Sequence, residues 1–330
     1  MGSFRVRPRR AWILTQPSIY PMLNNRNSDK FLSKTIENSV FDISNPDAYK
    51  RWRDNKLALY TQTPDLSISI DDPFAISPNE HKNLCQLITL FNMALYTTNK
   101  ANIADDNIPK SIGQSLGLFT LDRHLCSEES GIAALRFNPD RLHQDYIPYS
   151  RKPINWHTDG YYNTPEHRIN SVLLHCVSAA ESGGENAVMD PDILYILLRE
   201  INPELVQALM RPEVMTIPAN EKDGEIIREA QTGPVFIVNE HGRLHMRYTA
   251  RTRSIEWENI PIVKEAVEHI SRLLNDESSP YIIKFRMKPG QGIVCNNVLH
   301  MRSGFNDNDA TGEARLVYRA RYYDHIDCEV

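Results

Sequence analysis

The sequence predicts a mainly β protein, a β-sandwich or barrel with helices packed on its outside. From about residue 131 onward, short runs rich in β-forming residues alternate with turn residues. Capped or amphipathic segments interrupt these runs, as helices on the outside of a β core do. The chain also lacks the phosphate loops G-x-G-x-x-G and G-x-x-x-x-G-K that open many parallel α/β domains.

The first 130 residues are expected to cover this core. Residues 46–60 have a helical pattern, and a short strand is expected near residues 68–70. Ser77 and Glu80 form a capping box with Pro78 at the first helical position, so a second helix is predicted from there to about Leu95. Residues 1–130 are therefore interpreted as an N-terminal helical and strand elaboration, and residues 131–330 as the core of the same structural domain.

The predicted core consists of short strands and three helices. Pro289 to Gly292 is read as a tight turn of a β-hairpin that precedes His300. The helices begin at Asp190-Pro191, at Asn202-Pro203 and at about Pro261, the last with apolar residues at helical spacing up to Leu274. The strands are expected at residues 133–137, 171–177, 235–238, 281–287 and 293–296.

Composition excludes several classes of protein. The 330 residues contain 37 Lys and Arg against 42 Asp and Glu, a net charge of −5, so the overall charge gives no reason to expect a nucleic-acid partner. No run of about 18 apolar residues suggests a membrane span. Five cysteines do not make a disulfide scaffold, and a reducing, cytoplasmic location is expected. The basic tail, with Arg5, Arg7, Arg9 and Arg10, is interpreted as solvated, because Pro8 interrupts any targeting helix.

The segment Asn155 to Gly160 indicates a metal centre. Residues of a strand alternate between its two faces, so His157 and Asp159 project to the same side. His300, after the strand at 293–296, is the best third ligand. Two histidines and one carboxylate form the facial triad of non-haem Fe(II) oxygenases, which leaves coordination positions open. The alternative is that these histidines are structural, because H-x-D by itself recurs by chance.

A strand near the C-terminus carries several arginines on one face. Alternation places Arg315, Arg319 and Arg321 together, with Arg315 and Arg319 about 13 Å apart along the strand. Guanidinium groups on an otherwise apolar strand are costly unless anions pair with them, and arginine binds carboxylates through two parallel hydrogen bonds. The face is interpreted as a clamp for a dicarboxylate. The alternative is an edge strand with solvated arginines.

Five motifs in a fixed order resemble a known family. These are HTD at 157–159, LLHC at 173–176, GGENAVMD at 183–190, KPGQGIVCNNVLH at 288–300 and ARLVYRAR at 314–321. Their order and spacing resemble the Fe(II)/2-oxoglutarate dioxygenases of the taurine/2,4-D dioxygenase (TauD/TfdA-like) superfamily, and the layout is most similar to the γ-butyrobetaine hydroxylase branch. The resemblance covers about residues 131 to 325.

The resemblance implies a double-stranded β-helix (jelly roll) and an oxygenase that uses Fe(II), 2-oxoglutarate and O2. His157, Asp159 and His300 match the iron ligands of the family. Arg315 matches the arginine that grips the distal carboxylate of 2-oxoglutarate, and Arg319 matches a second arginine of taurine-type members. With Asp159 present, hydroxylation or desaturation is expected rather than halogenation. Asn186 is placed where a small polar residue helps to hold the co-substrate.

Substrate recognition is predicted from aromatic and cationic residues. Tyr149 matches one position of the aromatic cage used for trimethylammonium substrates, but Arg321 lies where another cage aromatic is expected and would repel such a cation. We therefore expect an anionic or zwitterionic small metabolite, bound by Arg321 and helped by Arg247 or Arg251. The alternative is a salt bridge from each arginine to a nearby acid. Tyr161 and Tyr162 follow the metal motif and are expected to line the substrate mouth, or else simply to pack.

Two other functions stay open at this point. A hydrolase-like metalloenzyme could use a different histidine set, drawn from His167, His175, His241 and His245. A catalytically silent jelly-roll binding protein is the second alternative. The expected partner is a small-molecule substrate, with neither nucleic acid nor membrane, and a homo-oligomer is expected because oligomers are common in the family.

Overall fold

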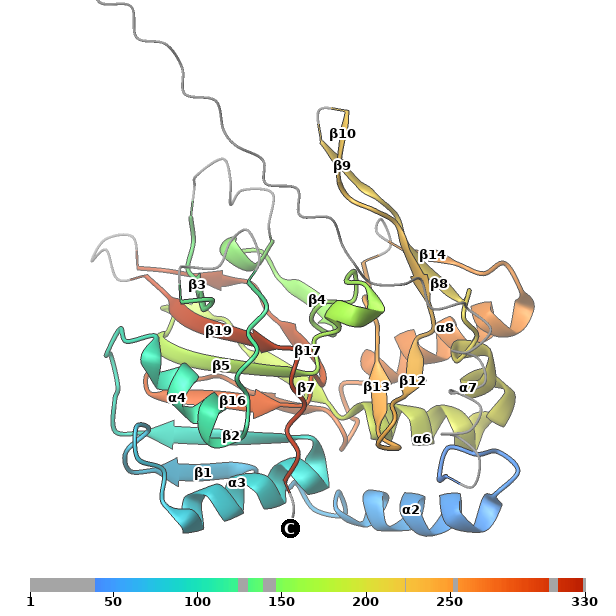
Figure 1. The fold of residues 1–330 in the computed structure, drawn as a ribbon, viewed down its shortest axis with the longest axis horizontal. Coiled ribbons are helices and arrows are strands. Elements are labelled where there is room, and N and C mark those ends of the chain that lie inside the picture. Colours follow the sequence, from blue (N-terminus) through green and yellow to red (C-terminus); the bar gives the residue numbers. More distant parts are fainter. Residues whose placement is uncertain are drawn as a thin grey trace, which may run out of the picture.

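The protein is described from a computed structural model that covers residues 39–123, 130–138, 147–222, 224–251, 255–308 and 314–328. Two β-sheets pack against each other, and their facing side chains, among them Val172, Val188, Ile293 and Leu299, belong to one buried core (Figure 1). The larger sheet has the order β1 (Ser67–Ile70), β2 (Met93–Thr98), β16 (Gln291–Cys295), β5 (Ser171–Ser178), β19 (Leu316–Tyr322) and β3 (Ala133–Leu135). The smaller sheet has the order β15 (Ile283–Phe285), β7 (Asn186–Met189), β17 (Leu299–Arg302) and β4 (Ile154–His157).

The strand order confirms the predicted double-stranded β-helix. Neighbouring strands come from distant parts of the chain, and all pairs except β1 with β2 are antiparallel. The larger sheet ends at β1 and β3 and does not close into a barrel. This interleaved order brings β4 next to β17, although more than a hundred residues separate them.

The predicted helices form where their capping residues indicate. Asn45, Ser77, Asp190 and Asn202 each accept a backbone hydrogen bond at a helix N-terminus, and a proline follows each of them. The helix from Pro78 ends at Phe91 rather than at about Leu95, because Asn92 has a left-handed conformation and β2 follows. The helices are α2 (Pro46–Ala58), α3 (Pro78–Phe91), α4 (Asn107–Ser115), α6 (Pro191–Ile201), α7 (Pro203–Leu209) and α8 (Pro261–Leu274).

The hairpin predicted at residues 289–292 is wrong. β15 and β16 lie in different sheets, so Pro289 to Gly292 carries the chain from one sheet to the other. Gly290 has φ +82°, and it bonds to Cys176 through its N–H and to Thr98 through its carbonyl. Thus the turn residues were recognised correctly, but the strand pairing on either side was not.

The N-terminal residues extend and cover the core. β2 pairs with β16 along its whole length, so the first part of the chain contributes strands to the main sheet. On the outer face, α3 and α4 pack over Leu173, Val294 and Tyr322. The division at residue 130 therefore stays a prediction. The tail with Arg5, Arg7, Arg9 and Arg10 lies outside the described residues.

A long excursion between β7 and β15 forms the right-hand part of Figure 1. Helices α6, α7 and α8 pack together there beneath short strands. The hairpin of β9 (Asn220–Lys222) and β10 (Glu225–Arg228) projects from this part of the molecule, as Figure 1 shows. The remaining strands are β6 (Ser182–Gly183), β8 (Met215–Ile217), β9 (Asn220–Lys222), β10 (Glu225–Arg228), β11 (Gln231–Gly233), β12 (Phe236–Val238), β13 (Leu244–Met246), β14 (Glu256–Trp257) and β18 (Phe305–Asn306).

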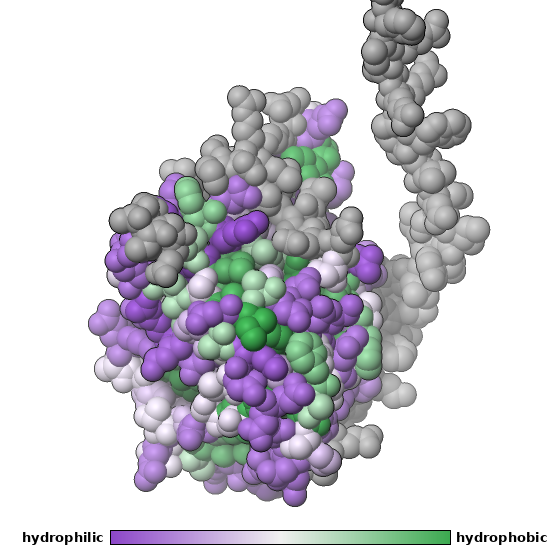
Figure 2. All heavy atoms as spheres, turned by 90° about the vertical axis from the view of Figure 1, so that its left-hand side faces the viewer, coloured by the Kyte–Doolittle hydropathy of each residue, from purple (hydrophilic) through white to green (hydrophobic). Residues whose placement is uncertain are grey.

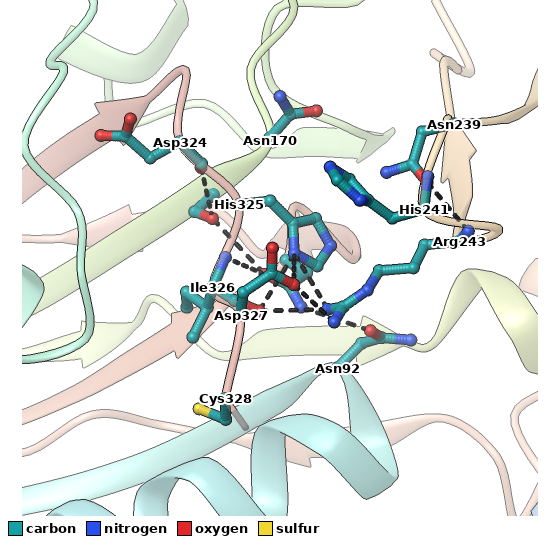
Figure 3. Close-up of polar contacts among 12 residues, drawn as sticks. Asn92, Asn170, Asn239, His241, Arg243, Asp324, His325, Ile326, Asp327 and Cys328 are labelled. Carbon is teal, nitrogen blue, oxygen red and sulfur yellow. Dashed lines mark hydrogen bonds and ion pairs between the residues drawn. The ribbon is translucent and has the colours of Figure 1, made fainter. Parts of the chain in front are cut away.

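The C-terminal segment after β19 is tied to two other parts of the fold. Figure 3 shows His325, Ile326 and Asp327 beside Arg243, which forms an ion pair with Asp327 and donates to the carbonyl of Ile326. Cys328 then forms a disulfide with Cys85 of α3. The five cysteines predict no disulfide scaffold and a reducing environment. This single bond joins residues 243 positions apart, a pairing that cysteine spacing alone does not reveal.

One face of the molecule is mostly polar. On the face shown in Figure 2, hydrophilic side chains predominate and hydrophobic ones are scattered among them. No helix within the described residues has both the length and the apolar character needed to cross a bilayer.

The buried His175 of β5 predicts a loss of stability in acid. Its side chain is fully buried beside Tyr96, and this burial lowers its pKa to about 4. The unfolded chain takes up a proton below about pH 6.5 and the native state does not, so stability falls as the pH drops from 6.5 towards 4. Between pH 7 and 5 this residue should account for about 2 kcal/mol of lost unfolding free energy.

Urea unfolding of a His175→Leu variant at both pH values checks this. Between pH 7 and 5, the unfolding free energy of this variant should fall by about 2 kcal/mol less than that of the wild type. A variant of an exposed histidine, His241→Leu, should show the same fall as the wild type. An unchanged acid dependence in His175→Leu would contradict the assignment.

Candidate metal centre and co-substrate cavity

Two adjacent strands bring the predicted metal ligands together. His157 at the end of β4 lies directly opposite His300 of β17 in the antiparallel register, and their ring centroids are 4.2 Å apart. Asp159 follows two residues after His157. One ligand atom from each of the three side chains lies within 4.8 Å of the others. The spacing predicted from strand alternation is thus realised in three dimensions.

Both imidazoles are oriented for metal binding through Nε2. The Nδ1 atoms of His157 and His300 lie 2.8 Å from the carbonyl oxygens of Asn155 and Val298. A Nδ1–H that donates to a carbonyl leaves the Nε2 lone pair free for a metal. Burial, with a smaller contribution from His300, lowers the pKa of His157 to about 3 and keeps it neutral, the form that binds metals.

Asp159 has one oxygen without a partner. Its Oδ1 accepts a hydrogen bond from Nη1 of Arg319 at 3.3 Å, whereas Oδ2 is buried and has no hydrogen-bond partner. Burial raises the pKa of Asp159, but the guanidiniums of Arg319 and Arg321 outweigh burial and hold this pKa below its ordinary value. The carboxylate therefore stays charged, with a lone pair available.

The three side chains fit a divalent iron ion. Two imidazoles and one carboxylate form the facial donor set of Fe(II) oxygenases, and the orphaned Oδ2 is an acceptor that such an ion satisfies. In the described part of the chain, these residues are the only group of three or more histidine, cysteine or acidic side chains close enough to share an ion. The alternative set of His167, His175, His241 and His245 does not form such a group there.

Asn297 and Gly160 hold the backbone around Asp159. The Asn297 side chain accepts from the N–H of Asp159 at 2.8 Å and donates to its carbonyl at 2.9 Å, and it is itself buried. Gly160 has φ +67°, and a Cβ atom there would lie 2.4 Å from Cγ1 of Ile169. A side chain at residue 160 would therefore both strain the turn and push Ile169 against the loop.

Gly160→Ala is predicted to destabilise the protein and weaken metal binding. The left-handed backbone costs about 1 kcal/mol for alanine and the clash about 1–3 kcal/mol more. Thermal unfolding and Mn(II) titration measure the two effects. Gly117→Ala is the matched control, since Gly117 has φ +80° but nothing within 4 Å of the new Cβ. Equal losses in both variants would show that backbone strain alone matters.

A cavity beside the two histidines is lined by arginines. Arg315 and Arg319 of the C-terminal strand, Asn186 of β7 and Arg302 of β17 all face it. Nη1 of Arg315, Nε of Arg319 and Nε of Arg302 are buried donors without a hydrogen-bond partner. Unpaired buried donors of one charge sign favour an anion in this cavity. The predicted dicarboxylate clamp and the predicted metal ligands thus line the same space.

Arg302 was missed by the sequence analysis. It donates to the carbonyl oxygens of Ser150 and Lys152, and its guanidinium lies 4.7 Å from the ring centroid of Phe305. Arg315 lies over the same ring at 5.1 Å. Burial and the nearby Arg315 lower the pKa of Arg302 to about 9. Its position two residues after His300 on a strand is the signal that could have identified it.

Arg321 is already paired within the protein. Its Nη1 donates to the hydroxyl of Tyr162 at 2.9 Å, and its Nη2 forms a buried ion pair with Asp122. For this residue the structure favours the salt-bridge alternative over a free substrate contact. The Arg247 guanidinium instead bonds only to backbone carbonyls, including that of Tyr161 at 2.6 Å.

The other predicted substrate residues are dispersed. Tyr149 is buried with Leu135, Cys176, Met287 and Val317 and packs in the core. Tyr161 and Tyr162 form an edge-to-face pair with centroids 5.0 Å apart. The side chain of Arg251 is exposed and does not line the cavity.

Comparison with known proteins identifies the family. The model of the taurine catabolism dioxygenase TauD, TfdA family matches residues 122–321, which include all three predicted metal ligands. The chain belongs to this family. The TauD/TfdA assignment confirms the resemblance seen in the five motifs, while the γ-butyrobetaine branch stays a prediction.

Two curated relatives are uridine-5'-phosphate dioxygenases. The one from Amycolatopsis sp is 29% identical over 177 residues, which cover 51% of this chain and 60% of the relative. The one from Streptomyces sp is 28% identical over 174 residues, covering 50% and 60%. The match thus spans 60% of the length of each of these relatives.

Solved structures confirm the fold. The non-heme iron oxygenase OrfP, in complex with Fe and L-Arg, has a TM-score of 0.52 at 11% identity, and the match covers 91% of this chain and 92% of that one. A taurine dioxygenase from Burkholderia xenovorans has a TM-score of 0.51 at 12% identity, with 79% and 86% covered. At these identities the likeness concerns the jelly roll alone.

Proposed function

We propose that this TauD/TfdA family member is an Fe(II)- and 2-oxoglutarate-dependent dioxygenase that oxidises an unactivated C–H bond of a small metabolite. One observation carries the proposal. His157, Asp159 and His300 present three free ligand atoms to one point, beside a cavity with unpaired arginine donors. A metal centre alone suits many reactions, but a metal centre next to arginines that can bind a dicarboxylate suits this one.

The residues have separate roles in this proposal. His157, Asp159 and His300 hold iron, which when bound activates O2 for the oxidation. Arg315 binds the distal carboxylate of 2-oxoglutarate, and Asn186 helps to hold the co-substrate. Arg319 keeps Asp159 charged and lies close to the same space. The Phe305 ring holds the Arg315 guanidinium in place, and Arg302 lies over the same ring. The overall reaction consumes 2-oxoglutarate and O2 and yields succinate, CO2 and the oxidised product.

The proposed substrate is a small anionic or zwitterionic metabolite. Two relatives are named for uridine-5'-phosphate, a phosphate monoester, which supports an anion. The Arg321 guanidinium is paired with Asp122, so it does not offer a free cationic group to this anion. A cytoplasmic location and a homo-oligomeric state remain predictions.

Succinate formation tests the proposal. Purified protein with Fe(II), 2-oxoglutarate and air should release succinate, and the rate should rise when a substrate that couples the reaction is supplied. His157→Ala should release none above background, because it removes one of the three iron ligands. Absence of succinate across a broad panel of acidic and zwitterionic substrates would refute the function. That result would favour one of the two alternatives, a metal-dependent hydrolase-like enzyme or a catalytically silent jelly-roll binding protein.

A further inference from the structure

The residues that follow β19 connect the strand to helix α3. We call residues 324–328 the C-terminal strap, and Figure 3 shows its course. The backbone N–H of Ile326 donates to the side-chain oxygen of Asn296 at 3.1 Å, and the Ile326 side chain is buried in the outer core. Cys328 forms the disulfide with Cys85 of α3. The strap therefore ties α3 to the turn that contains Asn296.

This turn also positions two of the proposed metal ligands. Residues 296–298 connect β16 to β17. The side chain of Asn297 accepts from the N–H of Asp159 and donates to its carbonyl. The carbonyl oxygen of Val298 lies 2.8 Å from Nδ1 of His300. A displacement of the turn would therefore disturb the hydrogen bonds of both ligands together.

The disulfide is the strongest tie at the end of the strap. The ion pair of Arg243 with Asp327 joins side chains that are 41% and 51% exposed, and exposed pairs contribute little to stability. The disulfide joins residues 243 positions apart, so breaking it gives the strap many more accessible conformations. Without it, the strap is held mainly by the buried Ile326 side chain and a few hydrogen bonds. We therefore expect it to fray from Cys328 toward Ile326.

Thiols can reach and break this disulfide. Cys328 is partly exposed, and the two ring nitrogens of His81 lie 3.7 and 3.9 Å from Sγ of Cys85. A thiolate of a dithiol attacks Sγ of Cys328, the S–S bond breaks, and Cys85 leaves as a thiolate beside the His81 imidazole, which stabilises it. The second thiol of the reagent then displaces Cys328. Two electrons and two protons pass to the protein, and the dithiol becomes a cyclic disulfide.

We propose that the Cys85–Cys328 disulfide is a redox latch for the metal centre. In the oxidised protein, the strap holds the turn at residues 296–298 and so keeps Asp159 and His300 in position for a metal. Reduction by a dithiol frees the strap, loosens the turn and lowers the affinity for the metal. The effect on metal binding rests on the proposed function, whereas the link between the disulfide and the turn does not.

Hydrogen exchange and metal titration test the two parts of this proposal. The full chain is compared in its oxidised form and after treatment with a dithiol, which is then removed by anaerobic gel filtration. Thiol alkylation with mass spectrometry identifies the cysteines that were reduced. Reduction should speed amide exchange in peptides that contain residues 296–298 and Ile326. It should also raise the Kd for Mn(II) about tenfold, as expected when groups that support metal ligands are disturbed.

Two serine variants serve as controls. Cys328→Ser should behave like the reduced wild type without any dithiol, because it cannot form the bond. Cys85→Ser should show the same loosened turn, and dithiol treatment should change nothing further in it. The reduced wild type provides the same test without a substitution, so a variant that fails to fold does not remove it.

The outcomes separate the latch from the proposed function. Unchanged exchange at residues 296–298 after reduction, or an unchanged Kd for Mn(II), would overturn the latch. A disulfide that a dithiol reduces only in denaturant, or a dithiol effect that persists in Cys85→Ser, would overturn it as well. Faster exchange throughout the chain would show that the bond supports the whole fold rather than this turn. If the oxidised wild type binds no Mn(II), the proposed metal centre is wrong, and exchange at the turn alone decides the latch.

Discussion

Asp159→Asn is expected to abolish iron-dependent succinate formation. The substitution removes the only carboxylate of the proposed metal centre and leaves Arg319 without the charge with which it pairs. Loss of groups that merely support metal ligands already costs 10- to 100-fold in affinity or activity, so loss of a ligand should cost more than about 100-fold. Mn(II) binding measured by calorimetry, and succinate formation with Fe(II), report the two consequences.

The control for this variant is a second buried carboxylate. Asp190 is fully buried, pairs with Lys56 at 2.7 Å and does not belong to the cluster of His157, Asp159 and His300. Asp190→Asn should lower the unfolding temperature by breaking a buried ion pair, yet it should keep its metal affinity. If Asp159→Asn binds Mn(II) as tightly as the wild type, the proposed ligand set is wrong. If both variants lose metal, unfolding rather than ligand loss explains the result.

Arg315→Gln is expected to raise the KM for 2-oxoglutarate about 100-fold. The Arg315 side chain is buried, its Nη1 has no partner, and it faces the cavity beside the histidines. Each charge-assisted hydrogen bond from arginine to a carboxylate contributes about 1.5–3 kcal/mol. Losing the equivalent of one such bond raises the KM by about this factor. Initial rates over a range of 2-oxoglutarate concentrations measure KM separately from kcat.

Arg136→Gln tests whether the effect is specific. Arg136 is an exposed arginine just beyond β3, the strand that pairs with β19. It should leave the KM unchanged. A KM for Arg315→Gln within twofold of the wild type would show that the cavity does not hold the co-substrate carboxylate, whereas a loss of kcat alone would point to a disturbed metal centre instead.

The cluster of His157, Asp159 and His300 was predictable because its motifs are local. His157 and Asp159 lie two residues apart at a strand end, and the motif around His300 made it the best candidate for the third ligand. The arginines of β19 were likewise visible from strand alternation, which the structure confirms, since Ala320 and Tyr322 pack on the opposite face. Helix starts at Ser77, Asp190 and Asn202 were predictable because capping depends on a few neighbouring residues.

Partners that come from distant parts of the chain were not predictable. Arg321 pairs with Asp122, and the two residues are 199 positions apart. Nothing in either local sequence marks this contact, so the expectation of a free substrate-binding Arg321 could not be tested before the fold was known. The Cys85–Cys328 disulfide and the placement of β15 and β16 in different sheets depend on long-range topology in the same way.

The fate of molecular oxygen tests the central claim most directly. A reaction under 18O2 with Fe(II), 2-oxoglutarate and a coupling substrate should give succinate that carries one 18O atom, as mass spectrometry detects. His300→Ala should give no labelled succinate. Unlabelled succinate from the wild type, or succinate labelled from H218O but not from 18O2, would contradict the account that His157, Asp159 and His300 form the iron centre of a 2-oxoglutarate dioxygenase.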